Sequence, residues 1–245
     1  MNNDLVLAGS RALFVGIGGL GCPAAIALVR SGVGTIGIAD DDEVELSNLH
    51  RQILFRDEDV GKSKVEAAAS ALLRIAPELR IERHVTRMLP HNAVELASRY
   101  DVIVEGSDNF ATKFLAADAC KIVRRPIIHA AAVRWHGTVL AVGPEGGPCY
   151  RCLFEDLPTG DAPSCAEAGV VGPMVGIVGA VQADLAVATL HGDDVAGTLV
   201  TFDGKTLETR RRKIPRRASC PLCSTTRSIK RIDPARYTAS NLAGT

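Results

Sequence analysis

Two kinds of apolar pattern alternate along much of the chain. Short continuous apolar runs bounded by turn residues are typical of buried parallel strands, whereas longer segments with apolar residues at every third or fourth position predict helices. The expected strands are 12–17, 35–39, 80–85, 101–105, 126–131 and 137–142, and the expected helices are 23–30, 64–75, 92–99 and 110–123. This alternation predicts an α/β fold with a Rossmann-like, doubly wound, mostly parallel sheet and helices on both faces.

The pattern changes in the second half of the chain. Residues 143–172 are rich in Gly, Pro, Cys and polar side chains, and a segment of this length predicts a functional or mobile loop. The apolar run 173–190 carries Gln182 and Asp184, which favours a buried helix over a membrane span. Because that helix must pack on the sheet of the first half, we interpret residues 1–245 as one domain.

The segments after this helix have the composition of a hairpin and a polar tail. Residues 197–202 and 206–213 flank Asp203-Gly204, a pair that favours a two-residue turn. We therefore predict a C-terminal hairpin extension of the sheet. The tail 228–245 is polar enough to fray.

Composition places the chain among compact globular proteins. Its 245 residues are 47% hydrophobic and 23% charged, with a formal net charge of +0. It can bury a full core and has no general electrostatic reason to bind nucleic acid or an anionic membrane, so we expect neither partner. The start, Met1–Asp4, lacks the basic and apolar regions of a secretory signal, which predicts a cytoplasmic protein.

The first strand leads into a glycine loop, Gly16-Ile17-Gly18-Gly19-Leu20-Gly21. Such a loop lets backbone N–H groups and a helix dipole approach a phosphate closely, which predicts a nucleotide site. Asp40, at the end of the next strand, is placed to hold a ribose. These features alone leave NAD or FAD binding open.

Charged residues beyond this loop favour a triphosphate. A nicotinamide pyrophosphate needs few cations, whereas a triphosphate with about four negative charges needs Arg and Lys, and usually Mg²⁺ held by a carboxylate. Asp40–Asp42 supply more carboxylates than ribose recognition needs, and Arg51, Lys64 and the loop 107–109 add further charges. Arg51 or Lys64 alone would be an ordinary surface residue, but together these charges suit ATP.

In these motifs the sequence resembles the ThiF/MoeB/HesA family, the prokaryotic relatives of ubiquitin-activating enzymes. The resemblance covers residues 10–224. It follows the family's order through the glycine loop, Asp40 to Gln52, the lysine of Gly61-Lys62-Ser63-Lys64, the loop Ser107-Asp108-Asn109, two Cys-x-x-Cys pairs and Cys165 to Gly169. The ordered set carries the resemblance, because any one of these motifs alone would be weak evidence.

The resemblance implies a role for each matching residue. The implied nucleotide-binding residues are Gly18, Gly19, Asp40, Asp42, Asn48, Arg51, Gln52, Lys64, Asp108 and Asn109. Asp40 would bind the ribose, and Asp108 would bind Mg²⁺. Arg51, Lys64 and Asp108 would also act in catalysis, since adenylation develops charge on phosphate oxygens, where preorganised cations and metal stabilise it.

The family adenylates the C-terminal Gly-Gly carboxylate of a small ubiquitin-like sulfur-carrier protein, releases pyrophosphate and works as a homodimer. A peptide carboxylate has a pKa of about 3.3 to 3.7, so it is already ionised at neutral pH and no general base is required. The resemblance therefore implies ATP and Mg²⁺ as cofactors and such a carrier as the partner. A separate sulfur donor is expected, because the chain ends too soon for an appended rhodanese-type domain.

Four of the seven cysteines form two Cys-x-x-Cys pairs, Cys149 with Cys152 and Cys220 with Cys223. Four thiolates in this spacing predict a tetrahedral, structural Zn²⁺ site that pins the end of the chain to its middle. A redox dithiol in either pair and a metal-free site are the alternatives.

The other cysteines divide into two groups. Cys165 stands alone in the Gly- and Pro-rich loop, where some family members use a cysteine covalently and others dispense with it. Cys22 and Cys120 lie on apolar helix faces and are expected in the core. The basic run 210–213 is expected to be a solvated strand face that could also meet an acidic carrier.

The sequence departs from the family pattern at its start, where family members have a longer arm with an arginine that reaches the partner subunit's ATP site. Residues 1–10 contain no arginine, so we expect another residue to supply that charge, weak adenylation, or a specialised sulfur or peptide-modifying pathway. Alternative functions are a divergent ATP-binding scaffold, a tRNA threonylcarbamoyladenosine dehydratase-like enzyme of the same family and, least favoured, a nicotinamide oxidoreductase.

Overall fold

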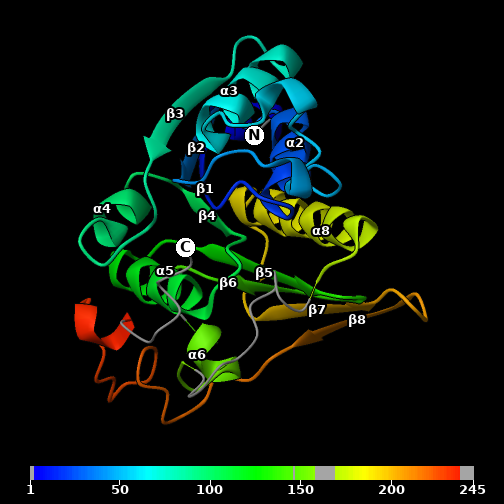
Figure 1. Ribbon diagram of the computed structural model, residues 1–245. Helices are drawn as coiled ribbons and strands as arrows, with labels where there is room; N and C mark the ends of the chain where they lie inside the picture. Colours follow the sequence, from blue (N-terminus) through cyan, green and yellow to red (C-terminus); the bar gives the residue numbers. More distant parts are fainter. Residues whose placement is uncertain (1–2, 146, 158–168, 238–245) are drawn as a thin grey trace.

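The computed structural model describes residues 3–145, 147–157 and 169–237, and its centre is an eight-stranded sheet (Figure 1). The strands are β1 Arg11–Val15, β2 Thr35–Asp40, β3 Arg80–Val85, β4 Val102–Glu105, β5 Ile127–Val133, β6 His136–Val142, β7 Thr198–Asp203 and β8 Glu208–Lys213. Their order is β3-β2-β1-β4-β5-β6-β7-β8. Pairing is parallel from β3 to β5 and antiparallel from β5 to β8, which confirms the expected Rossmann-like sheet with its C-terminal hairpin.

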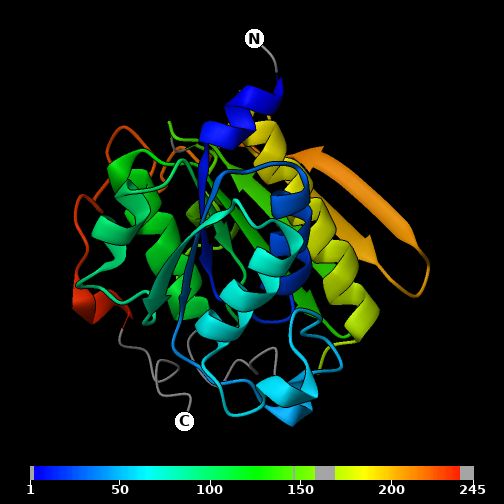
Figure 2. The same cartoon turned by 90° about the horizontal axis from the view of Figure 1, so that it is seen from above.

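Helices cover both faces of the sheet (Figures 1 and 2). They are α1 Asn3–Gly9, α2 Gly21–Arg30, α3 Lys64–Ile75, α4 Ala93–Ser98, α5 Phe110–Val123, α6 Tyr150–Leu153 and α8 Gly172–Leu190, with short 3-10 helices at Leu46–Asn48, Asp57–Asp59 and Pro234–Tyr237. Strand side chains alternate between two cores: Phe14 packs with α2, α3 and α8, whereas Leu13 and Val15 pack with α4 and α5.

The helix α8 is, within the described residues, the one helix long and apolar enough to cross a membrane by length and composition. It packs between α2 and the strands β5 and β6. A Cβ at Gly179 would lie 2.7 Å from the carbonyl oxygen of Leu20, and a Cβ at Gly137 of β6 would collide with Val178. Glycine at these two contacts lets α8 approach its neighbours closely, which supports the expected buried helix.

Two C-terminal expectations were wrong. The hairpin turn has four residues, 204–207, because Asp203 stays in β7 opposite Glu208 while its carboxylate accepts the amide of Lys205 at 2.9 Å. The tail does not fray over its first ten residues. Tyr237 is fully buried, and its hydroxyl donates to Asp118 of α5 at 2.7 Å.

Candidate functional site

The glycine loop turns sharply between β1 and α2. Gly16 has φ +86°, and its N–H donates to the carbonyl of Ala39 at 3.0 Å. A Cβ at Gly19 would lie 3.4 Å from Cγ of Arg51, and one at Gly18 would lie 3.7 Å from Nε2 of Gln52. The structure therefore brings Arg51 and Gln52 against the two glycines that were expected to approach phosphates.

Asp40 ties the glycine loop to the acidic loop after β2. Its carboxylate oxygens accept the backbone N–H of Ile17 at 2.9 Å and of Asp42 at 2.9 Å. Burial raises the pKa of Asp40 above its ordinary value. Because a carboxylate has about four acceptor sites, the two loop contacts leave acceptor capacity for a ribose hydroxyl.

Lys64, the first residue of α3, is buried and lies 2.8 Å from the carboxylate of Asp42. Arg87 contacts Asp41 at 2.6 Å and Asp42 at 3.4 Å. Partial burial raises the pKa of Asp42, but the hydrogen bond and charge of Lys64, with those of Arg87, hold it below its ordinary value. The lysine and the acidic loop thus neutralise each other in the structure.

Arg51 and Gln52 follow the 3-10 helix Leu46–Asn48. Arg51 donates to the side-chain carbonyl of Asn48 at 2.8 Å, and Asn48 donates to Glu45 at 3.2 Å. Gln52 is buried and its Oε1 has no hydrogen-bond partner among the described atoms. An unpaired buried amide oxygen, in a side chain whose nitrogen lies beside Gly18, is costly in the free chain and fits a bound ligand with a donor group.

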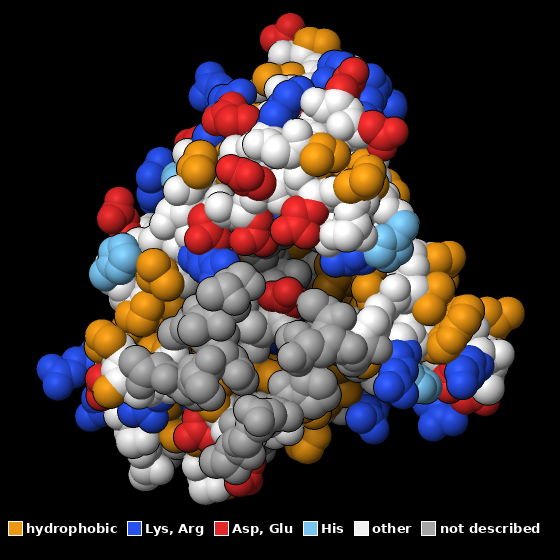
Figure 3. Space-filling model, viewed as in Figure 1, with side chains coloured by type: hydrophobic (Ala, Val, Ile, Leu, Met, Phe, Trp, Pro, Cys, Tyr) orange, Lys and Arg blue, Asp and Glu red, His pale blue; other side chains and the backbone are white. Residues whose placement is uncertain are grey.

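The loop after β4 lies against the glycine loop. A Cβ at Gly16 would lie 3.4 Å from the nitrogen of Ser107, and one at Gly106 would lie 3.2 Å from Cβ of Leu20. Asp108 is exposed in this loop. Figure 3 shows acidic side chains gathered near the middle of one face of the molecule. Asn109 caps α5, because its side-chain oxygen accepts the N–H of Thr112 at 2.8 Å. The loop that carries Asp108 therefore borders the glycine loop through Gly106 and Ser107, whereas the oxygen of Asn109 serves the helix.

A buried polar network behind this loop was missed at the sequence level. Glu105, the last residue of β4, is fully buried and accepts Lys113 of α5 at 2.8 Å and Nδ1 of His129 of β5 at 3.0 Å. Its other oxygen accepts both the N–H of Ser107, at 2.8 Å, and the Ser107 hydroxyl. The side chain of Gln182 in α8 donates to the Glu105 carbonyl at 2.8 Å. The available signal was a glutamate that ends an otherwise apolar strand and is followed by a lysine in the next helix.

The charge states within this network follow from its geometry. Burial alone would raise the pKa of Glu105, but the charge of Lys113 and the contact with His129 lower it to about 2. Burial lowers the pKa of His129 below its ordinary value. At neutral pH the carboxylate of Glu105 is therefore ionised and the imidazole of His129 is neutral.

A cavity of about 160 Å³ opens beside Asp108 and Asn109. Most of its remaining walls are apolar and come from β5, β6, β7 and α6. They include Val133, Leu140, Tyr150, Leu153, Phe154 and Leu199. This cavity, which the sequence did not indicate, places an apolar surface next to Asp108 and Asn109.

The four cysteines of the two Cys-x-x-Cys pairs converge at the far side of the sheet. Sγ of Cys149 lies 3.5 Å from that of Cys220, and Sγ of Cys152 lies 3.4 Å from that of Cys223. All four sulfur atoms lie within 4.8 Å of one another. Four such sulfur donors from two knuckles suit tetrahedral Zn²⁺.

The thiols do not ionise equally. Hydrogen bonds from its neighbours, Cys149 first, lower the pKa of Cys223 to about 5, and the same contact raises the pKa of Cys149. Burial raises the pKa of Cys152. Crowded thiolates repel one another, so a divalent cation at the centre is the arrangement that would let all four ionise.

Arg151, between the two cysteines of the first pair, anchors this region to the core. It is fully buried and holds Asp118 of α5 through two nitrogens at 2.8 and 2.9 Å. Tyr237 donates to the same carboxylate. The metal-type site, α5 and the C-terminal segment therefore form one packed unit, a connection without a local sequence signal.

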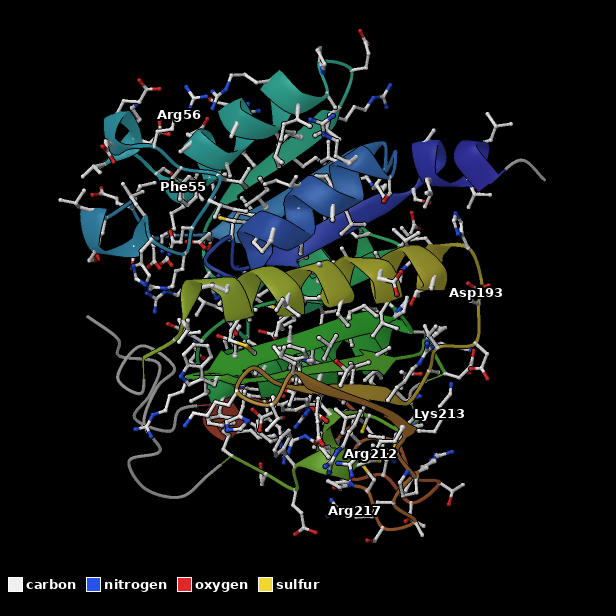
Figure 4. The ribbon with its side chains drawn as sticks, turned by 90° about the vertical axis from the view of Figure 1, so that its right-hand side faces the viewer. Phe55, Arg56, Asp193, Arg212, Lys213 and Arg217 are labelled. Atoms are coloured by element: carbon white, nitrogen blue, oxygen red, sulfur yellow. The ribbon has the colours of Figure 1, made fainter. Side chains whose placement is uncertain are left out.

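The remaining sequence candidates are three other cysteines and the basic run. Cys165 lies outside the described residues. Cys22 and Cys120 are fully buried, which confirms their place in the core, and burial raises the pKa of Cys22 to about 12. The basic run is exposed on β8, and Figure 4 shows Arg212 and Lys213 at the end of that strand, with Arg217 in the segment that follows.

Comparison with known proteins gives one family. A model of the ThiF family matches residues 3–222. The chain is similar to the "Adenylyltransferase and sulfurtransferase MOCS3" of Anopheles gambiae, with 38% identity over 236 residues that cover 95% of this chain and 54% of the relative. The same-named protein of Drosophila persimilis is 41% identical over 228 residues, which cover 91% and 51%. The chain spans about half the length of these curated relatives.

Solved structures with a similar fold include E. coli MccB with ATP, at a TM-score of 0.80 and 20% identity, covering 90% of this chain and 69% of that one. MccB in complex with N-formylated MccA has a TM-score of 0.79 and 21% identity, covering 91% and 70%. PaaA has a TM-score of 0.73 and 25% identity, covering 86% and 66%.

Proposed function

The chain belongs to the ThiF family, and we propose that it adenylates the C-terminal carboxylate of a small ubiquitin-like carrier protein that ends in Gly-Gly. The observation that carries the proposal is the meeting of the glycine loop with Arg51, Gln52 and the loop of Asp108 at one edge of the sheet. A simple dinucleotide site needs the glycines but not these groups. The relatives named as adenylyltransferases support the same assignment.

The residues present fit ATP. The unpaired oxygen of Gln52 lies in a residue that contacts the glycine loop, and Gly18 and Gly19 leave room that side chains would fill. Arg51 lies beside the same loop. Lys64 could bind a phosphate if it gave up its ion pair with Asp42. E. coli MccB, whose fold resembles this one, was solved with ATP, which supports a nucleotide here.

In the proposed reaction a carboxylate oxygen of the carrier attacks the α-phosphorus of ATP. The new bond joins carboxylate oxygen to phosphorus, the bond from the α-phosphorus to the bridging oxygen breaks, and pyrophosphate leaves with that oxygen. Arg51 would stabilise the negative charge that develops on the phosphate oxygens, and Lys64 would exchange Asp42 for a phosphate. The carrier carboxylate is ionised already, so the residues position and stabilise charge without removing a proton.

Two metals complete the proposal. Mg²⁺ would be held by Asp108, whose exposed carboxylate suits a hard cation, and it would screen phosphate charge when bound. Zn²⁺ would be held by Cys149, Cys152, Cys220 and Cys223. The zinc site has four protein ligands and lies apart from the glycine loop, so its role is structural.

Further parts of the proposal come from the family resemblance. We propose a homodimer, a separate sulfur donor and a cytoplasmic location. The apolar cavity beside Asp108 offers a surface for the approaching carrier tail. A covalent role for Cys165 stays a prediction.

The test is carrier-dependent exchange of labelled pyrophosphate into ATP. We expect exchange only with a carrier that keeps its terminal Gly-Gly, and a large loss in Arg51→Ala and Lys64→Ala. Unchanged exchange in both variants would contradict the assigned residues. ATP binding without exchange on any cognate carrier would favour the scaffold alternative.

A further inference from the structure

We propose that Glu105 is a positioning residue of the nucleotide site, because its carboxylate fixes Ser107 and thereby sets where Asp108 points. This inference rests on the proposed function, in which Asp108 holds Mg²⁺ at the phosphates. Glu105 itself is fully buried, so it would act through Ser107 and not by touching ATP or Mg²⁺.

The contact with Ser107 is two-pronged. One oxygen of Glu105 accepts the Ser107 backbone N–H at 2.8 Å, and the same oxygen accepts the Ser107 hydroxyl. A residue held through both its backbone and its side chain has little freedom, and Asp108 follows it directly in the chain. The direction of the Asp108 side chain is therefore determined largely by a buried group at the end of the strand that leads into its loop.

The other contacts hold Glu105 itself in place. Lys113 and His129 bind its second oxygen, and Lys113 also donates to the carbonyl of Ala130 at 2.7 Å. Gln182 bridges the carbonyls of Glu105 and Ile128 at 2.8 Å each. Side chains from α5 and β5 thus hold the Glu105 carboxylate, and a side chain from α8 holds its backbone carbonyl.

Stability alone is a poor reason for such a network. A buried ion pair loses much of its attraction to desolvation, and apolar residues of similar volume often replace it at no cost. The loop that Glu105 holds also meets the glycine loop at Gly16 and Leu20. A small displacement of Ser107 would therefore shift both the loop of Asp108 and the glycine loop.

The experiment measures ATP binding to the full chain by calorimetry over a series of Mg²⁺ concentrations. Glu105→Gln keeps the shape but removes the charge, and we expect it to raise the Mg²⁺ concentration for half-maximal ATP binding about tenfold, as loss of an outer-shell partner does at other metal sites. Ser107→Ala removes one of the two contacts and is expected to raise it about threefold.

Asp118→Asn is the matched control, because Asp118 is an equally buried carboxylate paired with Arg151 away from the glycine loop. It should lower the melting temperature without moving the Mg²⁺ dependence. If Glu105→Gln does not fold, Ser107→Ala still tests the proposal, since its loss of one hydroxyl leaves the ion pair with Lys113 in place.

A wild-type Mg²⁺ dependence in Glu105→Gln and Ser107→Ala, or an equal shift in Asp118→Asn, would overturn the positioning role while leaving the proposed function intact. Failure of the wild-type chain to bind ATP with Mg²⁺ at all would overturn the proposed function and this inference together.

Discussion

The proposed nucleotide site and the four-cysteine site differ in what holds them together. At the nucleotide site the charged groups satisfy one another: Lys64 pairs with Asp42, Arg87 with Asp41, and Arg51 with Asn48. At the cysteine site four thiols face mainly each other, at sulfur distances of 3.4 to 3.9 Å. Thiol contacts are weak, so this second site gains far more from a bound cation.

The difference separates activity from folding. A site that is internally paired keeps its shape without ligand, and a substitution there should remove function before stability. A site that joins residues 71 positions apart through its ligand should do the reverse. The parallel half of the sheet would thus carry the chemistry. The segments that follow the antiparallel strands would depend on a bound metal for their stability.

The largest effect is expected at the cysteines. Cys220→Ser removes one of four ligands, so we expect loss of bound zinc and a fall in melting temperature of about 10 °C or more. Metal content and scanning calorimetry measure both. Cys120→Ala, a buried cysteine outside the cluster, should keep the metal. A wild-type chain with well under one zinc per molecule would contradict the site.

The next effect is on activity alone. Lys64→Ala should lower carrier-dependent pyrophosphate exchange about 10²- to 10³-fold, because a preorganised charge near the phosphates is lost. Its melting temperature should change by only a few degrees, since the partner Asp42 is half exposed and can be solvated. Lys62→Ala, an exposed lysine two residues earlier, is the control and should retain exchange. Equal losses of exchange in Lys64→Ala and Lys62→Ala would contradict a specific role for Lys64.

Acid stability tests the buried network between these regions. Glu105 has a folded pKa of about 2, below its ordinary unfolded value of about 4.3, so its contribution is full above about pH 5 and is lost as the pH falls toward 2. The wild-type chain should lose a few kcal/mol of unfolding free energy over that window through this group. Urea unfolding from pH 5 to 3 should show a shallower decline in Glu105→Gln, and parallel declines would contradict the assignment.

The smallest effect is expected in the C-terminal segment. Tyr237→Phe removes one hydrogen bond to Asp118, which Arg151 still holds, so we expect a loss of about 1 kcal/mol. Urea unfolding measures it, and exchange activity should not change. A loss of activity with full stability would instead connect this tail to the nucleotide site.

Local patterns were sufficient for much of the fold. The bounds of α3, β3 and α5 agree with the expectation from periodicity. Boundary residues mark these elements in the chain itself: Ser63 precedes α3, Pro77 separates α3 from β3, and Asn109 precedes α5. Arg51 lies against Gly19, and Lys64 pairs with Asp42, because the carboxyl ends of parallel strands share one edge of the sheet.

Non-local contacts were the part that the sequence did not predict. Glu105, Lys113 and His129 meet only because β4 lies beside β5 and under α5. Tyr237 is buried because it reaches Asp118, 119 positions earlier. In both cases the sequence alone predicts an exposed polar side chain, because the distant partner that hydrogen-bonds to it cannot be identified from local pattern.

The most direct test of adenylation follows the phosphorus atoms. The full chain, loaded with zinc, is incubated with Mg²⁺, a Gly-Gly-ending carrier and ATP labelled at either the α- or the γ-phosphorus. The proposed reaction transfers the α-label to the carrier as an alkali-labile acyl-AMP and leaves the γ-label in pyrophosphate. Label on the carrier from γ-labelled ATP, or no label from either, would contradict it.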